Sequence, residues 1–78
     1  MKTMTCKQLG GACNKEFSAE TFEEVAELSK LHGMEMFQKQ DSEHLEAMQR
    51  VQALMQEPEK MQAWYEAMKQ EFAALPED

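Results

Sequence analysis

"CKQLGGAC", residues 6–13, holds both cysteines of the chain, with a Gly-Gly pair between them. Glycine takes positive φ at no steric cost, so "LGG" predicts a turn that reverses the chain. The strand-like run "KTMTC" at 2–6 precedes this turn, and "CNKEF" at 13–17 follows it. We therefore predict a β-hairpin within residues 1–18, which must pack on other elements because an isolated hairpin is barely stable in water.

The first helix signal after the hairpin is "TFEE" at 21–24, which fits a capping box with Thr21 as the N-cap and Glu24 reaching back to it. The apolar residues that follow recur at helical spacing and predict a first helix over 22–38. Gly33 lies within this helix, where it costs roughly 1 kcal/mol relative to alanine. We expect Gly33 to permit the close approach of another backbone, that of the hairpin.

Two more helices are predicted in the second half of the chain. Asp41 or Ser42 is a suitable N-cap for a helix over 42–56. Pro58 suits a first helical position and opens a third helix over 58–74. The long apolar faces of these two helices predict a helical hairpin. The expected fold is a single α+β domain over 1–78, mainly helical, with an N-terminal β-hairpin followed by three α-helices.

Charge and composition exclude several classes of protein. The net charge of the 78 residues is −7, and residues 1–15 carry three lysines and no acid. Binding to nucleic acid needs clustered Lys and Arg, so we expect no nucleic-acid partner. The N-terminus lacks the apolar run of a signal peptide and no segment could span a membrane, so we expect a cytoplasmic protein without a membrane partner. Cytosolic thiols are kept reduced, which argues against a structural disulfide.

The cysteines and a histidine together suggest a metal site. Thiolates and imidazole nitrogens are the ligands that zinc prefers. Cys6 and Cys13 can converge from the hairpin, and His32 can join them from the helix packed on it. Six residues separate the cysteines, whereas zinc knuckles usually have two to four. Spacing alone leaves two alternatives open, a zinc site and a pair of reduced thiols.

The opening "MKTMTCKQLGGAC", the helix start "TFEE" and "HG" at 32–33 resemble a family of short uncharacterised prokaryotic proteins, a domain of unknown function of the "small metal-binding protein" type. The resemblance covers residues 1–36. The family pattern has a first Cys, L-G, a second Cys and a helix with H-x-x-x-H-G. It implies metal ligands at Cys6, Cys13 and His32.

This sequence departs from the family pattern at Leu28, where the first histidine of H-x-x-x-H-G would fall. Two histidines at i and i+4 share a helix face and can chelate one ion, whereas leucine cannot. The site is then lost, open to water or completed by another group. His44 is the candidate replacement for the fourth ligand. The alternative is that His44 is a partly buried histidine of the second predicted helix.

Other chemistries have less support. Lys2, Lys7 and Lys15 would favour thiolates in a redox pair, but neither C-x-x-C nor a βαβ pattern is present. Met34 and Met36 are two residues apart and point to different helix faces, which disfavours a copper site. No Ser/His/Asp order and no phosphate-binding Gly loop occurs, so we expect no enzyme. Zinc is the one cofactor expected.

A protein-interaction module is the rival prediction from a different class. A soft aromatic face on the third predicted helix could serve as a homodimer interface or bind a small protein partner; it consists of Trp64, Tyr65, Met68 and Phe72. Under this alternative the cysteines are reduced and inert. The same residues also fit an intramolecular core.

Overall fold

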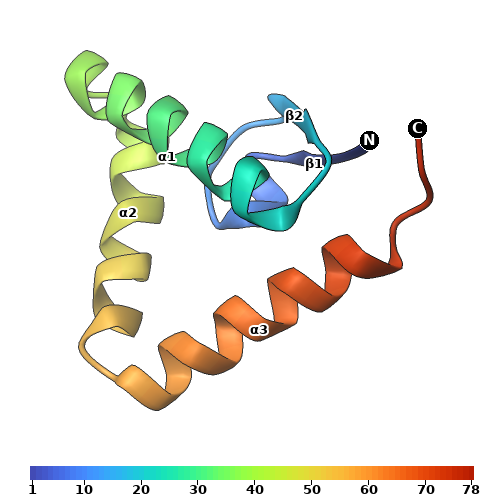
Figure 1. Cartoon of the computed structure of the whole chain (residues 1–78). Coiled ribbons are helices and arrows are strands. Elements are labelled where there is room, and N and C mark those ends of the chain that lie inside the picture. The colour runs from blue at the N-terminus through green and yellow to red at the C-terminus, as the bar shows by residue number, and fades with distance from the viewer.

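The structure, a computed structural model that describes residues 1–78, has a two-stranded antiparallel sheet followed by three helices (Figure 1). The elements in chain order are β1 (Lys2–Thr5), the 3-10 turn η1 (Lys7–Leu9), β2 (Glu16–Ala19), α1 (Phe22–Lys39), α2 (Ser42–Met55) and α3 (Pro58–Ala74). The predicted α+β, mainly helical class is confirmed. No helix combines the length and the apolar character needed to cross a membrane.

The hairpin has Met4 opposite Phe17 across the two strands. Its returning strand begins at Glu16 rather than at Cys13, because residues 6–13 close into a loop of their own. The carbonyl oxygen of Cys6 accepts hydrogen bonds from the amides of Leu9 (3.0 Å) and Gly11 (2.8 Å). The turn lies at Gly10, whose φ of 94° is the positive value expected for glycine. Both cysteines therefore lie in the loop beyond the sheet.

Local hydrogen bonds define where the first two helices begin. The hydroxyl of Thr21 accepts from the amide of Glu24 at 3.2 Å, as predicted for the α1 N-cap. Asp41, rather than Ser42, caps α2 and accepts from the amide of His44 at 3.0 Å. Pro58 is the first residue of α3. α1 ends at Lys39, one residue beyond the expected end, and α2 ends at Met55, one residue before it.

The core lies between the sheet, the start of α1 and the second half of α3. Its nine buried members are Met4, Cys6, Leu9, Phe17, Ala19, Phe22, Val25, Met68 and Phe72. Phe22 packs edge-on against Tyr65 and Phe72, with ring centroids 5.2 and 6.0 Å apart. Trp64 and Tyr65 are half-buried and pack against this core. The aromatic face of α3 thus contributes to the intramolecular core.

Gly33 does not have the role expected from the sequence. A Cβ atom at this position would meet only the flexible end of Met48, with Cε at 3.7 Å. The expectation of a close backbone contact with the hairpin is therefore wrong. The reason is that this part of α1 faces a side chain of α2, which leaves room for a methyl group.

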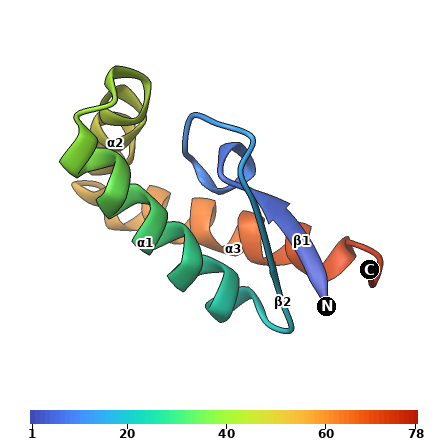
Figure 2. The same ribbon diagram turned by 90° about the horizontal axis from the view of Figure 1, so that it is seen from above.

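The helices give the molecule a flat, open shape. α2 and α3 meet at the Gln56-Glu57 turn and diverge from it, as Figure 1 shows. In the turned view the hairpin lies beside α1 and α3, and α2 stands apart from the sheet (Figure 2). The principal extents are 33 × 29 × 15 Å. Only two residues of α2, His44 and Ala47, are buried, so α2 has few apolar contacts that hold it in place.

Candidate metal centre

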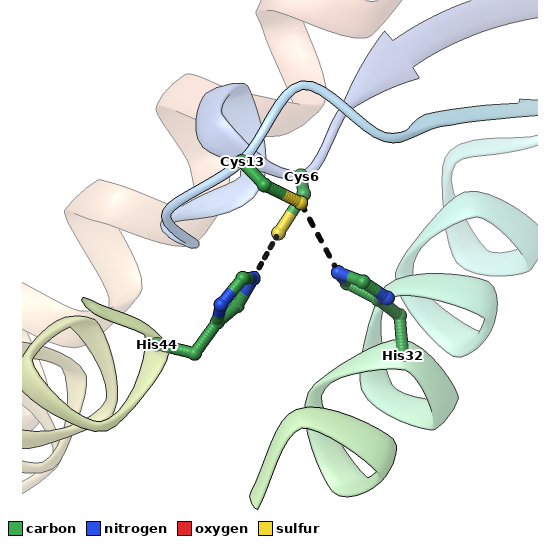
Figure 3. Close-up of side chains that lie close together, drawn as sticks. All are labelled: Cys6, Cys13, His32 and His44. Atoms are coloured by element: carbon green, nitrogen blue, oxygen red, sulfur yellow. Dashed lines mark hydrogen bonds between the residues drawn. The ribbon is translucent and has the colours of Figure 1, made fainter. Parts of the chain in front are cut away.

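Four side chains that can bind a metal converge at one point: Cys6, Cys13, His32 and His44. One ligand atom from each lies within 4.8 Å of the other three. Figure 3 shows the two imidazoles pointing toward the thiols from opposite sides. The loop after β1 supplies the cysteines, α1 supplies His32 and α2 supplies His44. Residues up to 38 positions apart in the sequence are thus brought together.

Each sulfur faces one imidazole nitrogen. The Sγ of Cys6 lies 3.6 Å from Nε2 of His44, and the Sγ of Cys13 lies 3.3 Å from Nε2 of His32. The two imidazole rings are 5.2 Å apart between centroids and are tilted by 79°. Both rings therefore present the same nitrogen, Nε2, to the space that the sulfurs border.

The cluster is shielded from water. Cys6, His32 and His44 are 3%, 8% and 6% exposed, and Cys13 is half-buried. The ring of Phe17 packs on the ring of His32 with centroids 5.6 Å apart. Polar groups this far removed from water need partners. Here each of the four polar side chains finds its partner within the cluster or at Asp41.

The glycine pair determines where the Cys6 thiol can lie. A Cβ atom on Gly11 would overlap the Sγ of Cys6, and one on Gly10 would come within 2.6 Å of the indole of Trp64. The loop is therefore in close contact with both the Cys6 thiol and the Trp64 side chain of α3. Only glycine at position 11 leaves the sulfur its place in the cluster.

The two thiols differ in acidity. Burial raises the pKa of Cys6, against the opposing influence of the backbone amides of Cys13 and Ala12. Burial also acts to raise the pKa of Cys13, but the backbone amide of Lys15 and the His44 imidazole outweigh it, so this pKa is lowered. Backbone amides thus favour the thiolate form at both sulfurs. The thiolate is the form that binds a metal.

His44 is oriented by Asp41. The Oδ2 atom of Asp41 accepts from Nδ1 of the imidazole at 2.5 Å, and this contact raises the pKa of His44 although burial opposes it. The same hydrogen bond lowers the pKa of Asp41. A neutral imidazole that donates from Nδ1 has a free lone pair on Nε2, the atom that faces Cys6. This role of Asp41 was not predicted from the sequence, although D-x-x-H with the Asp at an N-cap is its signal.

His32 has no such carboxylate partner. Burial lowers the pKa of His32, followed by the positive charges of His44 and Lys15. A lowered pKa keeps the ring neutral near pH 7. The neutral ring is the form that can act as a ligand.

Leu28, where the resemblance implies a histidine, is not part of the cluster. It lies one turn before His32 and is 39% exposed. The second imidazole of the cluster comes from His44 on α2 instead. The sequence left three outcomes open: a lost site, a site open to water, or another group in place of the missing histidine. The structure agrees with the third, because His44 joins the cluster.

An open groove between α1 and α2 leads to the cluster. Cys6 and His44 both line this groove. An ion can therefore reach the ligands without passing through the core, as a functional metal site requires.

No family model, curated protein or solved structure matches this chain. The resemblance to small metal-binding proteins therefore stays a prediction.

Proposed function

We propose that this protein binds or senses one zinc ion through Cys6, Cys13, His32 and His44. The observation that carries the proposal is the convergence of four ligand atoms within 4.8 Å of one another. Two thiols and two imidazoles form one of the usual sets for a closed zinc site, in which protein fills all four positions.

The two sulfur–nitrogen separations in the cluster match those expected between ligands of one tetrahedral ion. Zinc lies about 2.3 Å from sulfur and about 2.0–2.1 Å from nitrogen, so a sulfur and a nitrogen on the same ion are about 3.5 Å apart. The two Cys–His contacts measure 3.6 and 3.3 Å. On binding, any ligand atoms that lie farther apart, at up to 4.8 Å, would move closer together.

The donor set favours zinc over other metals. Calcium and magnesium take oxygen ligands, and the cluster offers sulfur and nitrogen. In a Cys2His2 two-iron cluster both cysteines bind one iron and both histidines the other. Here the four ligand atoms instead all lie within 4.8 Å of one another. This close grouping of sulfur and nitrogen atoms fits a single ion.

Zinc would join parts of the fold that share few other contacts. The four ligands come from the loop, α1 and α2, and only 12 of the 78 residues are buried. Chains of this size often need a metal or a partner for stability. Because binding free energy then adds to folding free energy, the position of α2 would depend on zinc. That dependence is how a small protein of this kind could report zinc.

The rival proposal, inert reduced cysteines in an interaction module, explains less of the cluster. A thiol is a weak hydrogen-bond donor and acceptor, so it is a poor partner for a buried imidazole. Two such pairs lie side by side here, and Asp41 also directs the Nε2 lone pair of His44 at a sulfur. These features have a common explanation if the four atoms bind an ion.

The direct test is elemental analysis of protein purified without metal-affinity resin, followed by cobalt titration under reducing conditions. We expect one zinc per chain. Cobalt should give sulfur-to-metal charge-transfer absorption that saturates at one equivalent and is displaced by zinc. Cys6→Ser and Cys13→Ser should each weaken that absorption. His32→Ala and His44→Ala should alter the bands of tetrahedral cobalt.

Thr21→Ala is the matched control, because it removes a helix cap that contacts none of the four ligands. It should bind cobalt like the wild type. Protein that contains no zinc and binds no cobalt at micromolar concentration would contradict the proposal.

A further inference from the structure

The groove between α1 and α2 is a hollow with a volume of about 710 Å³. Its walls are α1 and α2, and the loop with Leu9 and Gly11 closes one end. Met34, Phe37 and Met55 line it and are 54%, 61% and 59% exposed. These are among the most exposed large apolar side chains of the chain, and they gather on one surface.

The groove contains no carboxylate. The chain has 15 acidic residues among 78, yet none of the 18 residues that line the groove is acidic, and Lys30 is the one lysine or arginine there. Three of the lining residues are methionines. Depletion of charge with enrichment of methionine and aromatic residues is typical of the centre of a protein interface.

The chain exposes more surface than a compact monomer of its mass is expected to expose. A folded monomer of 9.0 kDa is expected to expose about 4,850 Å². This chain exposes 5,520 Å². The excess of about 670 Å² approaches the roughly 800 Å² that each partner contributes to an interface of standard size. No other element of the fold covers this groove, which is open on one side.

We propose that the α1–α2 groove docks a second copy of this chain in a two-fold symmetric dimer. Phe37 is the most exposed of the large apolar side chains and stands at the groove itself. One surface therefore carries both a protruding side chain and a hollow, which a symmetric contact requires. Because each copy carries a charge of −7, the absence of carboxylates from the groove avoids repulsion where the copies meet. The proposal does not rest on zinc binding.

The test is sedimentation equilibrium of the full chain from about 5 to about 500 μM, since dimer formation depends on concentration. We expect a monomer–dimer equilibrium that shifts toward the dimer as salt screens the net charge. Met34→Glu and Phe37→Glu should each weaken dimerisation about tenfold or more, because each places a charge at the contact. Circular dichroism checks that these variants remain folded.

Leu31→Glu is the matched control. Leu31 lies on α1 one turn before Met34, is 55% exposed and does not line the groove. It should dimerise like the wild type. The methyl signals of Met34 and Met55 should shift with protein concentration, whereas that of buried Met68 should not.

Three results would overturn the proposal. A wild type that stays monomeric over the whole range excludes the dimer. Equal weakening by Leu31→Glu and Met34→Glu, or no weakening by Met34→Glu and Phe37→Glu, places the contact elsewhere. A monomeric wild type whose Met34 and Met55 signals shift only on addition of an amphipathic helical peptide shows that the groove takes a different occupant.

Discussion

Asp41 contacts His44 twice, once through the backbone and once through the ring. Its Oδ2 atom accepts from the amide at 3.0 Å and from Nδ1 at 2.5 Å. The first contact caps α2, and the second directs Nε2 toward Cys6. One carboxylate thus determines both where the helix begins and how its histidine is oriented. Carboxylate–histidine–metal arrangements are common in zinc sites.

Asp41→Ala should weaken zinc binding about 10- to 100-fold, because His44 loses the partner that orients it. It should also reduce the free energy of unfolding by about 1 kcal/mol through loss of the cap. Thr21→Ala removes the other side-chain cap and should show the same stability loss with unchanged zinc affinity. Competition with a chromophoric chelator measures the affinity. Equal zinc affinities of wild type and Asp41→Ala would show that Asp41 only caps the helix.

The two histidines should titrate in a defined order in protein stripped of metal by a chelator. The pKa of His44 is raised by Asp41, and that of His32 is lowered by burial, so His32 should lose its proton at the lower pH. The raised pKa means that the Asp41 contact stabilises the fold below the unfolded pKa of about 6.5. This contribution is lost as the pH rises through the folded pKa.

Proton NMR of the two imidazole rings measures this order directly. Asp41→Asn should lower the pKa of His44 and shift that of His32 much less, because Asp41 contacts only the His44 ring and acts on His32 only through the charge of His44. If both rings titrated together in the wild type, the proposed hydrogen bond between Asp41 and His44 would not exist in solution.

Gly11→Ala and Gly33→Ala should have opposite effects on the free energy of unfolding. A methyl group on residue 11 overlaps the Cys6 sulfur, so Gly11→Ala should abolish or strongly weaken cobalt charge transfer and destabilise the fold by about 1–3 kcal/mol. A methyl group on residue 33 meets only Met48 at ordinary contact distance. Gly33→Ala should therefore stabilise the protein by up to about 1 kcal/mol. Denaturant melts and cobalt spectra measure both, and similar results for the two variants would contradict the loop geometry.

Removal of zinc should lower the thermal midpoint. A ligand at about 100 times its dissociation constant stabilises the folded state by about 2.7 kcal/mol. In a domain of this size that corresponds to a shift of about 10 °C or more. Melts with and without a chelator test this, and the Cys6→Ser, Cys13→Ser double variant should show no shift. A chelator effect of equal size in that variant would show that zinc binds elsewhere.

The elements of the fold were predictable because their signals are local. The capping box at Thr21, the proline at residue 58 and the glycine turn each act within a few residues. The structure places the helix boundaries at or next to the expected residues for the same reason. The returning strand started later than expected because the backbone hydrogen bonds within the loop hold Cys13 out of the ladder.

The candidate metal centre was predictable only in part. Cys6, Cys13 and His32 stand out by residue type and by the resemblance to small metal-binding proteins. His44 could be named only as a candidate, because a position on the apolar face of a helix is more typical of a packed histidine than of a ligand. The role of Asp41 depends on the direction of one ring, which depends in turn on how α2 packs.

By itself the sequence determined the hairpin, the three helices and the set of residues able to bind a metal, since periodicity, caps and residue chemistry are properties of short stretches. Only the tertiary structure decided that four such residues meet within 4.8 Å. It also decided that the aromatic face of α3 lies against the core while the α1–α2 groove stays open. These outcomes depend on the angles at which helices cross, and those angles follow from packing summed over the whole chain.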